Sequence, residues 1–258
     1  MKRIFHVTTF TFRELIRSKM LYIWLLSAIV FCLLAFLLSI LSFGEVHKIF
    51  MDLGLVGMEW SGTLVLLLSL AVTYNTEFEQ KSIYLQLAKP ITRGEYLLGR
   101  VLGFFSVISL VVLGMGLLIA GLVVFVGQGQ VSPMFFYSSI FLLIEMFVLT
   151  TLGLTFQMIG TSMVGVVLYS MFTVFLGHCV GQVEWLLNQN LAPAVKTALR
   201  VIHFFLPNLE AFNLKDRIYD PNLILGWEQW REVLLYGFTY SFVVFLIGWI
   251  NLEKREFM

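Results

Sequence analysis

The sequence predicts an all-α membrane protein with six transmembrane helices and an N-terminal interfacial amphipathic helix. Hydrophobic residues make up 59% of the 258-residue chain and charged residues 13%, about half the usual share in globular proteins. The mean hydropathy of +0.89 points the same way. Several uncharged stretches reach the roughly 20 residues that a helix needs to cross about 30 Å of hydrocarbon. We therefore expect residues 1–258 to form a single transmembrane domain.

Residues 1–19 precede the first span, and their pattern predicts a helix that lies in the headgroup region. On a helical wheel the charged side chains fall on one side and most apolar ones on the other. The apolar arc consists of Ile4, Phe5, Phe12, Leu15 and Ile16. The alternative is an ordinary positively charged leader to the first span.

The predicted spans differ in length and in what separates them. They cover residues 21–43, 55–75, 101–126, 134–156, 163–180 and 233–250. Pro133 suits the first turn of the fourth span. Segment 76–100, between the second and third spans, is polar and dense in charge, and the long mixed segment 181–232 precedes the sixth.

Lysine and arginine residues predict the orientation of the chain. They gather in the N-terminal segment, in 76–100 and in the C-terminal tail, which places both termini and this loop in the cytoplasm. Segment 181–232 then lies outside, although its five Lys and Arg residues disagree with the rule. Within it, residues 194–205 are too short and too charged to span, so they either lie in the interface or dip in and return.

Composition and missing motifs exclude several classes of protein. The net charge of +1, without a basic block, argues against nucleic acid as a partner. The phosphate-binding loop, the dinucleotide fingerprint and common hydrolase and zinc-protease motifs do not occur, so we expect no enzyme activity and no cofactor in this chain. The four histidines are scattered, and no metal site is expected; His178 is interpreted as a hydrogen-bonded interfacial residue.

Two acidic residues within the spans are candidates for a translocation path. Glu145 lies in the middle of the fourth span, where a carboxyl group in hydrocarbon is a functional candidate; the alternative is a protonated Glu bonded to a neighbouring helix. Glu59 lies near the outer end of the second span and is expected to be wetted by solvent. Two glycine pairs also have the spacing of close helix packing, Gly99/Gly103 and Gly177/Gly181.

The charged segment 76–100 predicts a short amphipathic helix, a stop at Pro90 and a new helix start. Thr92 can cap that next helix, because Glu95 follows at capping-box spacing. A short helix across the cytoplasmic ends of two spans is a suitable shape for docking a partner. Periodicity alone leaves a solvated loop equally open.

The same loop resembles the signature region of ABC-2 type transporter permeases. There, an acidic pair precedes a short helix, a Leu-Ser-x-Pro-x-Ser-Arg-like run and a Gly-Lys/Arg pair. The matching residues here are Glu77 and Glu79, the run Leu-Ala-Lys-Pro-Ile-Thr-Arg at 87–93, and Leu-Gly-Arg at 98–100. Segments 12–19 and 205–214 are similar to the opening helix of that family and to a run before its last span.

The resemblance extends over essentially the whole chain, and within the family the chain looks like the branch associated with maturation of multicopper enzymes. One departure is Lys81-Ser82, where the family usually has Gly-Thr. The resemblance implies a multi-pass permease subunit of an ABC-2 exporter in a bacterial-type inner membrane. Two such subunits, identical or different, would pair around a path through the lipid membrane.

The resemblance also implies a separate ATP-binding cassette ATPase, which would bind ATP and Mg. The implied coupling residues are Glu77, Glu79, Lys81, Tyr84, Leu87, Pro90 and Arg93, together with the tight turn 157–162. The alternative function is a membrane scaffold or assembly factor that moves no substrate. A secondary transporter ranks third, because such a protein would need more paired polar groups at the membrane midplane.

Overall fold

A computed structural model describes residues 2–41, 46–80, 82–83, 91–126, 130–160, 162–187, 189, 192–215 and 226–254. These residues form helices, and no strand occurs among them. Six of the described helices are long and apolar enough to cross a membrane. They are Met20–Ile40, Val46–Glu79, Arg93–Phe125, Pro133–Ile159, Met163–Val183 and Trp227–Lys254. Within the described residues, the all-helical fold and the presence of six helices able to cross a membrane are therefore confirmed.

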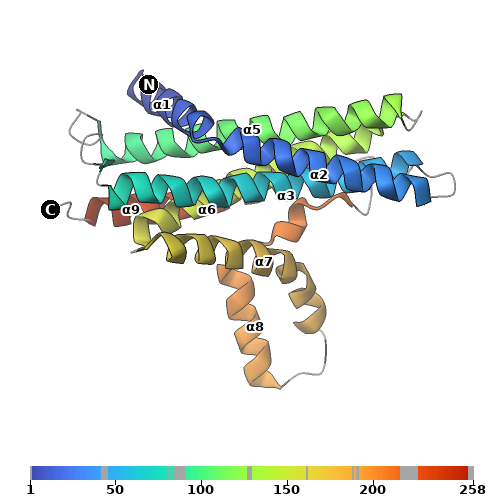
Figure 1. The fold of residues 1–258 in the computed structure, drawn as a ribbon. Coiled ribbons are helices and arrows are strands. Elements are labelled where there is room, and N and C mark those ends of the chain that lie inside the picture. The colour runs from blue at the N-terminus through green and yellow to red at the C-terminus, as the bar shows by residue number, and fades with distance from the viewer. Residues whose placement is uncertain are drawn as a thin grey trace.

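The long helices run along one bundle, and the start of α1 lies at the same end as the finish of α9 (Figure 1). The elements are α1 (Lys2–Arg17), α2 (Met20–Leu41), α3 (Val46–Tyr74), the π-helix η1 (Asn75–Glu79), α5 (Arg93–Phe125), α6 (Pro133–Ile159), α7 (Met163–Leu187), α8 (Pro193–Phe205), the 3-10 helix η2 (Leu209–Phe212) and α9 (Trp227–Lys254).

Several helices begin earlier than the predicted spans. α3 begins at Val46 rather than at 55, α5 at Arg93 rather than at 101, and α9 at Trp227 rather than at 233. Hydropathy marks the part of a helix that lies in hydrocarbon, whereas the helix itself continues until its end is capped. The helices therefore extend beyond the predicted spans at these ends, and α5 begins directly after Thr92, as its capping-box spacing predicts.

Two predicted helix starts are confirmed. At the start of α5, the Thr92 hydroxyl accepts from the Glu95 amide at 3.2 Å, and the Glu95 carboxylate accepts from the Thr92 amide at 3.0 Å. This is a complete capping box. α6 begins at Pro133, and the Ser132 side chain caps it by accepting from the Met134 amide at 3.3 Å.

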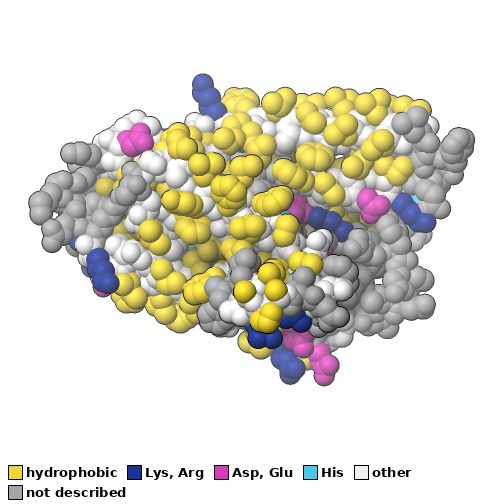
Figure 2. All heavy atoms as spheres, turned by 90° about the horizontal axis from the view of Figure 1, so that it is seen from below, with side chains coloured by type: hydrophobic (Ala, Val, Ile, Leu, Met, Phe, Trp, Pro, Cys, Tyr) yellow, Lys and Arg dark blue, Asp and Glu magenta, His cyan; other side chains and the backbone are white. Residues whose placement is uncertain are grey.

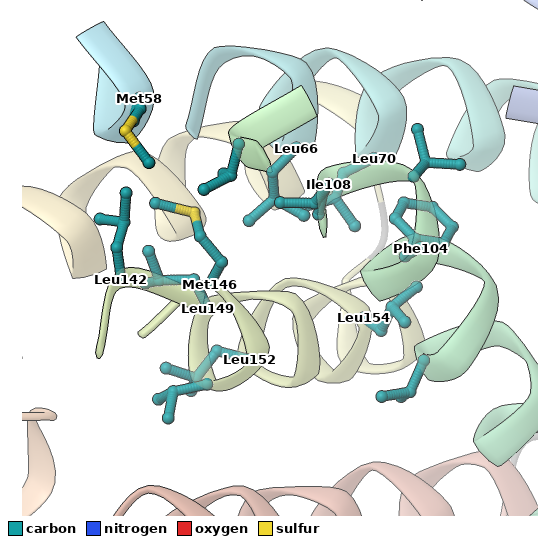
Figure 3. Packing of buried hydrophobic residues seen from close by; sticks show 14 of the residues in the cluster. Met58, Leu66, Leu70, Phe104, Ile108, Leu142, Met146, Leu149, Leu152 and Leu154 are labelled. Carbon is teal, nitrogen blue, oxygen red and sulfur yellow. The ribbon is translucent and has the colours of Figure 1, made fainter. Parts of the chain in front are cut away.

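The apolar core lies between α3, α5 and α6 (Figure 3). It is built from Met58, Leu66 and Leu70 on α3, Phe104 and Ile108 on α5, and Leu142, Met146, Leu149, Leu152 and Leu154 on α6. α6 is the most central span, with 72% of its most apolar window buried, whereas the value for α2 is 17%. Apolar side chains are spread widely over the described part of the face in Figure 2, where they outnumber the charged ones. That surface suits contact with lipid.

The first predicted glycine pair lets α1 lie obliquely across α5 (Figure 1). A Cβ atom on Gly99 would fall 2.6 Å from the Cβ of Val7, and one on Gly103 would fall 2.5 Å from the Cβ of Thr11. Only glycine permits so close an approach at these positions. The close-packing interpretation of this pair is confirmed.

Helix α1 divides its apolar side chains between protein and surroundings. Leu15 is 1% exposed beneath the helix, while Phe5, from the same predicted arc, is 69% exposed. The side chains of the predicted apolar arc therefore face different environments, because the helix contacts α5 through Val7 and Thr11, which are not part of that arc. Placement of α1 in the headgroup region stays a prediction.

The segment before the last span forms its own structure. α8 projects away from the bundle (Figure 1), and the chain then turns back toward α7. Leu209 and Glu210 pack over Gly177 and Gly181, where a Cβ atom would fall within 2.6 Å and 2.8 Å of their side chains. The second glycine pair is confirmed as a packing site. It brings segment 209–215 against the bundle.

Candidate functional site

The acidic residue Glu77 lies inside the protein. Its carboxylate forms an ion pair with the Arg100 guanidinium of α5, and neither side chain has any exposed surface. Arg100 also bonds Glu14 of α1 at 2.8 Å, and Thr11 at 3.3 Å. This polar network joins the end of α3, the first turns of α5 and the amphipathic helix.

The predicted docking role of Glu77 therefore needs correction. Its side chain is 0% exposed, and its partner is an arginine of the same chain. The burial could not be seen from the sequence, because the two residues are 23 positions apart on different helices (77 to 100). The buried side chain of Glu77 offers no surface to a partner; it holds the segment after α3 against α5.

The other predicted coupling residues divide into three groups. Glu79 is exposed and accepts from the Asn75 amide group at 2.7 Å. Arg93 is half-buried and donates to the backbone carbonyl of Leu252 at 2.7 Å, which ties the start of α5 to the end of α9. Four further coupling residues lie outside the described residues: Lys81, Tyr84, Leu87 and Pro90.

The second predicted docking element, the turn after α6, lies beside the end of α3, where the first predicted element begins. The Tyr74 hydroxyl donates to the Gly160 carbonyl at 3.3 Å, and the Gln157 amide donates to the Thr73 hydroxyl at 3.2 Å. Residues that are 84 to 86 positions apart in the chain thus meet at one end of the bundle. We call this end, defined by Thr73–Gln80, Arg93–Arg100 and Gln157–Ser162, the docking end.

A second polar site lies further along the bundle and contains both candidate path residues. Glu59 of α3 and Glu145 of α6 approach the imidazole Nε2 of His178 of α7, at 3.0 Å and 3.5 Å from their Oε1 atoms. Lys215, which follows η2, donates to the other oxygen of Glu59. Glu210 places a carboxylate oxygen 4.0 Å from His178 Nδ1. We call these five residues the carboxylate–histidine cluster.

The three helices bring their polar residues to a similar level. Glu59 lies 13 residues after the start of α3 (46 to 59), and Glu145 lies 12 residues after the start of α6 (133 to 145). His178 lies nine residues before the end of α7 (178 to 187). At 1.5 Å per residue, these positions are roughly 14–20 Å from the helix ends that the predicted topology places outside.

Burial differs across the cluster. The side chain of Glu145 is 4% exposed, as expected for a mid-span residue, and that of Glu59 is 13% exposed. Glu59 is therefore less wetted than the sequence indicated, because Lys215 and His178 cover it. Two carboxylates, an imidazole and an ammonium group in one low-dielectric site can hold a cation or pass a proton.

Sequence reasoning missed His178 and Lys215 as members of this site. The sequence indicates only a hydrogen-bonded interfacial histidine at His178 and names no partner for it, and Lys215 is 156 positions from its partner Glu59. The available signal was the Gly177/Gly181 pair, which flanks His178 and marks where the returning segment packs. Glycine spacing alone names no contacting residue, so the cluster could not be assembled from it.

A larger apolar cavity of about 360 Å³ lies between α5, α6 and α9. Leu102, Phe147 and Phe242 are among its lining residues, and Thr151 and Ser241 contribute the hydroxyl groups. Such a lining suits hydrocarbon chains. None of its described lining residues is charged or belongs to the carboxylate–histidine cluster, so the two sites are separate.

The fold and these sites define a helical protein with six described helices able to cross a membrane, arranged as in a multi-pass membrane protein. No protein-family model matches the chain, and no characterised protein aligns with it significantly.

Proposed function

We propose that this protein is the permease subunit of an ATP-driven ABC-2 type transporter that works as an exporter. The observation that carries the proposal is the docking end. Two segments that the family resemblance assigns to ATPase docking, far apart in the chain, meet at this end: Tyr74, the last residue of α3 before the charged segment, donates through its hydroxyl to the Gly160 carbonyl of the 157–162 turn at 3.3 Å. One partner can therefore contact both.

The docking end is built to pass a displacement into the spans. The Glu77–Arg100 ion pair joins α3 to α5, and Arg100 extends the connection to Glu14 of α1. Arg93 adds α9 by donating to the Leu252 carbonyl. A push on the segment between α3 and α5 would thus move four helices together, because buried ionic and hydrogen-bonded contacts resist separation.

The proposal divides the work between two chains. The sequence lacks a phosphate-binding loop, so ATP and Mg bind the partner ATPase, which hydrolyses ATP. A second permease subunit completes the transporter and encloses the path between the two copies. Exposed apolar side chains on α2, α7 and α9 provide surface for that subunit and for lipid.

Cross-linking tests the docking assignment directly. Cysteines replace Glu79 and Ser162, which are exposed at the docking end, and Gln130, which is exposed near the opposite end of the bundle, in a background without Cys32 and Cys179. The protein is coexpressed with a candidate ATP-binding cassette ATPase and treated with a bifunctional maleimide. Glu79→Cys and Ser162→Cys should cross-link to the ATPase, and Gln130→Cys should not.

Reversing the charge of Glu79 tests whether the ATPase binds at this end. Glu79→Arg should lower recovery of the ATPase in mild detergent, whereas the matched Gln130→Arg variant should recover it normally. The proposal would be refuted if the purified protein carried no ATPase and neither Glu79→Cys nor Ser162→Cys cross-linked to one.

The second candidate is a membrane scaffold that moves no substrate. The observation that favours it is the filled apolar core between α3, α5 and α6 (Figure 3). Reconstituted complexes distinguish the two functions. ATP-dependent movement of a fluorescent lipid or amphiphile across proteoliposomes supports the transporter, while a complex that hydrolyses ATP without moving any tested amphiphile favours the scaffold.

A further inference from the structure

The carboxylate–histidine cluster has the donor atoms of a metal site. One oxygen each of Glu59 and Glu145 and one ring nitrogen of His178 all lie within 4.8 Å of one another. They come from α3, α6 and α7, which are far apart in the chain, so no local sequence motif predicts that they meet. Imidazole and carboxylate together suit divalent transition metals, and zinc sites commonly combine them.

The distances between donor atoms fit one ion. His178 Nε2 lies 3.0 Å from Glu59 Oε1 and 3.5 Å from Glu145 Oε1. Ligands bound at about 2.0–2.2 Å in a tetrahedron stand roughly 3.3–3.6 Å apart. Two of the three donor–donor distances are thus close to those of a bound ion, and the third lies within 4.8 Å.

A second observation points to a ligand at the same place. The Glu145 side chain is 4% exposed, and within the part of the chain that the structure describes its buried Oε1 atom accepts no hydrogen bond, with the His178 imidazole 3.5 Å away. It lines a cavity of about 10 Å³ that Glu59 and His178 also line. This volume holds one water-sized particle. A buried carboxylate oxygen that faces such a cavity without a hydrogen bond is costly unless a ligand satisfies it.

The surrounding residues serve the three donor groups. Lys215 binds Oε2 of Glu59, which leaves Oε1 directed at His178. On the far side of the imidazole, Glu210 lies 4.0 Å from Nδ1 and is held by the Asn213 amide at 2.7 Å. A carboxylate behind a histidine is the usual outer partner of a metal-binding imidazole, because it orients the ring.

We infer that Glu59, Glu145 and His178 form a binding site for one divalent transition-metal ion, with Zn²⁺ as the probe. The fourth position is open to water from the cavity. The ion joins α3, α6 and α7 and stabilises the packing of segment 209–215 over them. This inference goes beyond the proposed transport function and does not depend on it, because it concerns binding by the purified chain.

Calorimetric titration tests the site. The full chain is purified in detergent through a histidine-free tag, stripped with a chelator, and titrated with ZnCl₂. One equivalent should bind. Glu145→Gln, which keeps the shape of the side chain, and His178→Gln should each weaken binding at least about ten-fold. His6→Gln and Glu79→Gln, both exposed and distant, should bind as the unchanged chain does.

Two further measurements keep the result unambiguous. Size-exclusion profiles must show that each variant is folded, and Glu59→Gln replaces any variant that is not. Co²⁺ bound in place of Zn²⁺ should give a visible absorption band that the Glu145→Gln variant lacks. Absence of stoichiometric binding, or equal binding in the ligand and control variants, would overturn the inference and leave a cluster that binds protons alone.

Discussion

Arg100 on α5 forms an ion pair with Glu77 of η1, the π-helix that follows α3, and both side chains are completely buried. The pair connects two spans where the predicted docking segment begins. Charged groups removed from water are tolerated only when they are paired and hydrogen-bonded. Glu14 and Thr11 of α1 provide the additional bonds to Arg100.

Breaking this pair should destabilise the fold. Glu77→Ala or Arg100→Met leaves the other charge buried without its main partner, which typically costs about 3–5 kcal/mol. We expect a lower free energy of unfolding, measured as an earlier thermal transition in detergent. Glu79→Ala, two residues away and exposed, is the matched control and should unfold with the unchanged protein. Equal transitions for Glu77→Ala and Glu79→Ala would contradict the role assigned to the pair.

Replacing glycine at the α1–α5 contact should displace α1. In Gly103→Leu the new side chain would occupy the position of Thr11, where a Cβ atom already falls 2.5 Å from the Thr11 Cβ. A cysteine at buried Val7 should then react several-fold faster with a maleimide, in a background without Cys32 and Cys179.

The control for this experiment is Gly121→Leu, also on α5, where a Cβ atom meets nothing within 4 Å. It carries the same gain of roughly 1 kcal/mol in helix propensity without the clash. If Gly103→Leu leaves the reactivity of Val7→Cys at the level of this control, the close approach of the helices is not present in solution.

The capping box at Thr92 should control the opening of the first turn of α5. Thr92→Ala removes the hydroxyl that accepts from the Glu95 amide, at a typical cost of about 1 kcal/mol, or about five-fold in local opening. Hydrogen exchange at 94–97 should accelerate accordingly, and Thr92→Ser should restore it. Thr9→Ala, on an exposed helical threonine without a cap, should leave that exchange unaltered.

Labelling of single cysteines in intact cells tests which side of the membrane each end of the bundle faces. The predicted orientation places Glu79 in the cytoplasm and Gln130 outside, at opposite ends of α5. A membrane-impermeant maleimide should therefore label Gln130→Cys but label Glu79→Cys only after the cells are opened.

Lys196→Cys on α8 resolves the disagreement about segment 181–232. Labelling from outside supports the six-span orientation, despite the Lys and Arg residues of that segment. Protection of Lys196→Cys until lysis, with Gln130→Cys also protected, would reverse the orientation.

The parts of the fold that followed from the sequence depend on local physics. Hydrocarbon thickness requires long apolar segments, so six spans could be counted along the chain. The Thr92 and Glu95 capping box joins residues three positions apart, and Pro133 marks a helix start by its own geometry. Glu145 was conspicuous because a carboxyl group is rare within an apolar span.

Contacts between distant helices decided the rest. Glu77 belonged to a docking motif in the sequence, yet the fold turns it inward to Arg100, and His178 became part of a cluster only when α7 packed beside α3 and α6. Each pairing depends on helix rotation and on the close approach that glycine permits. Burial and charge pairing are properties of that packing, so the sequence by itself determined the membrane-spanning elements, while the tertiary structure alone decided which charges meet inside them.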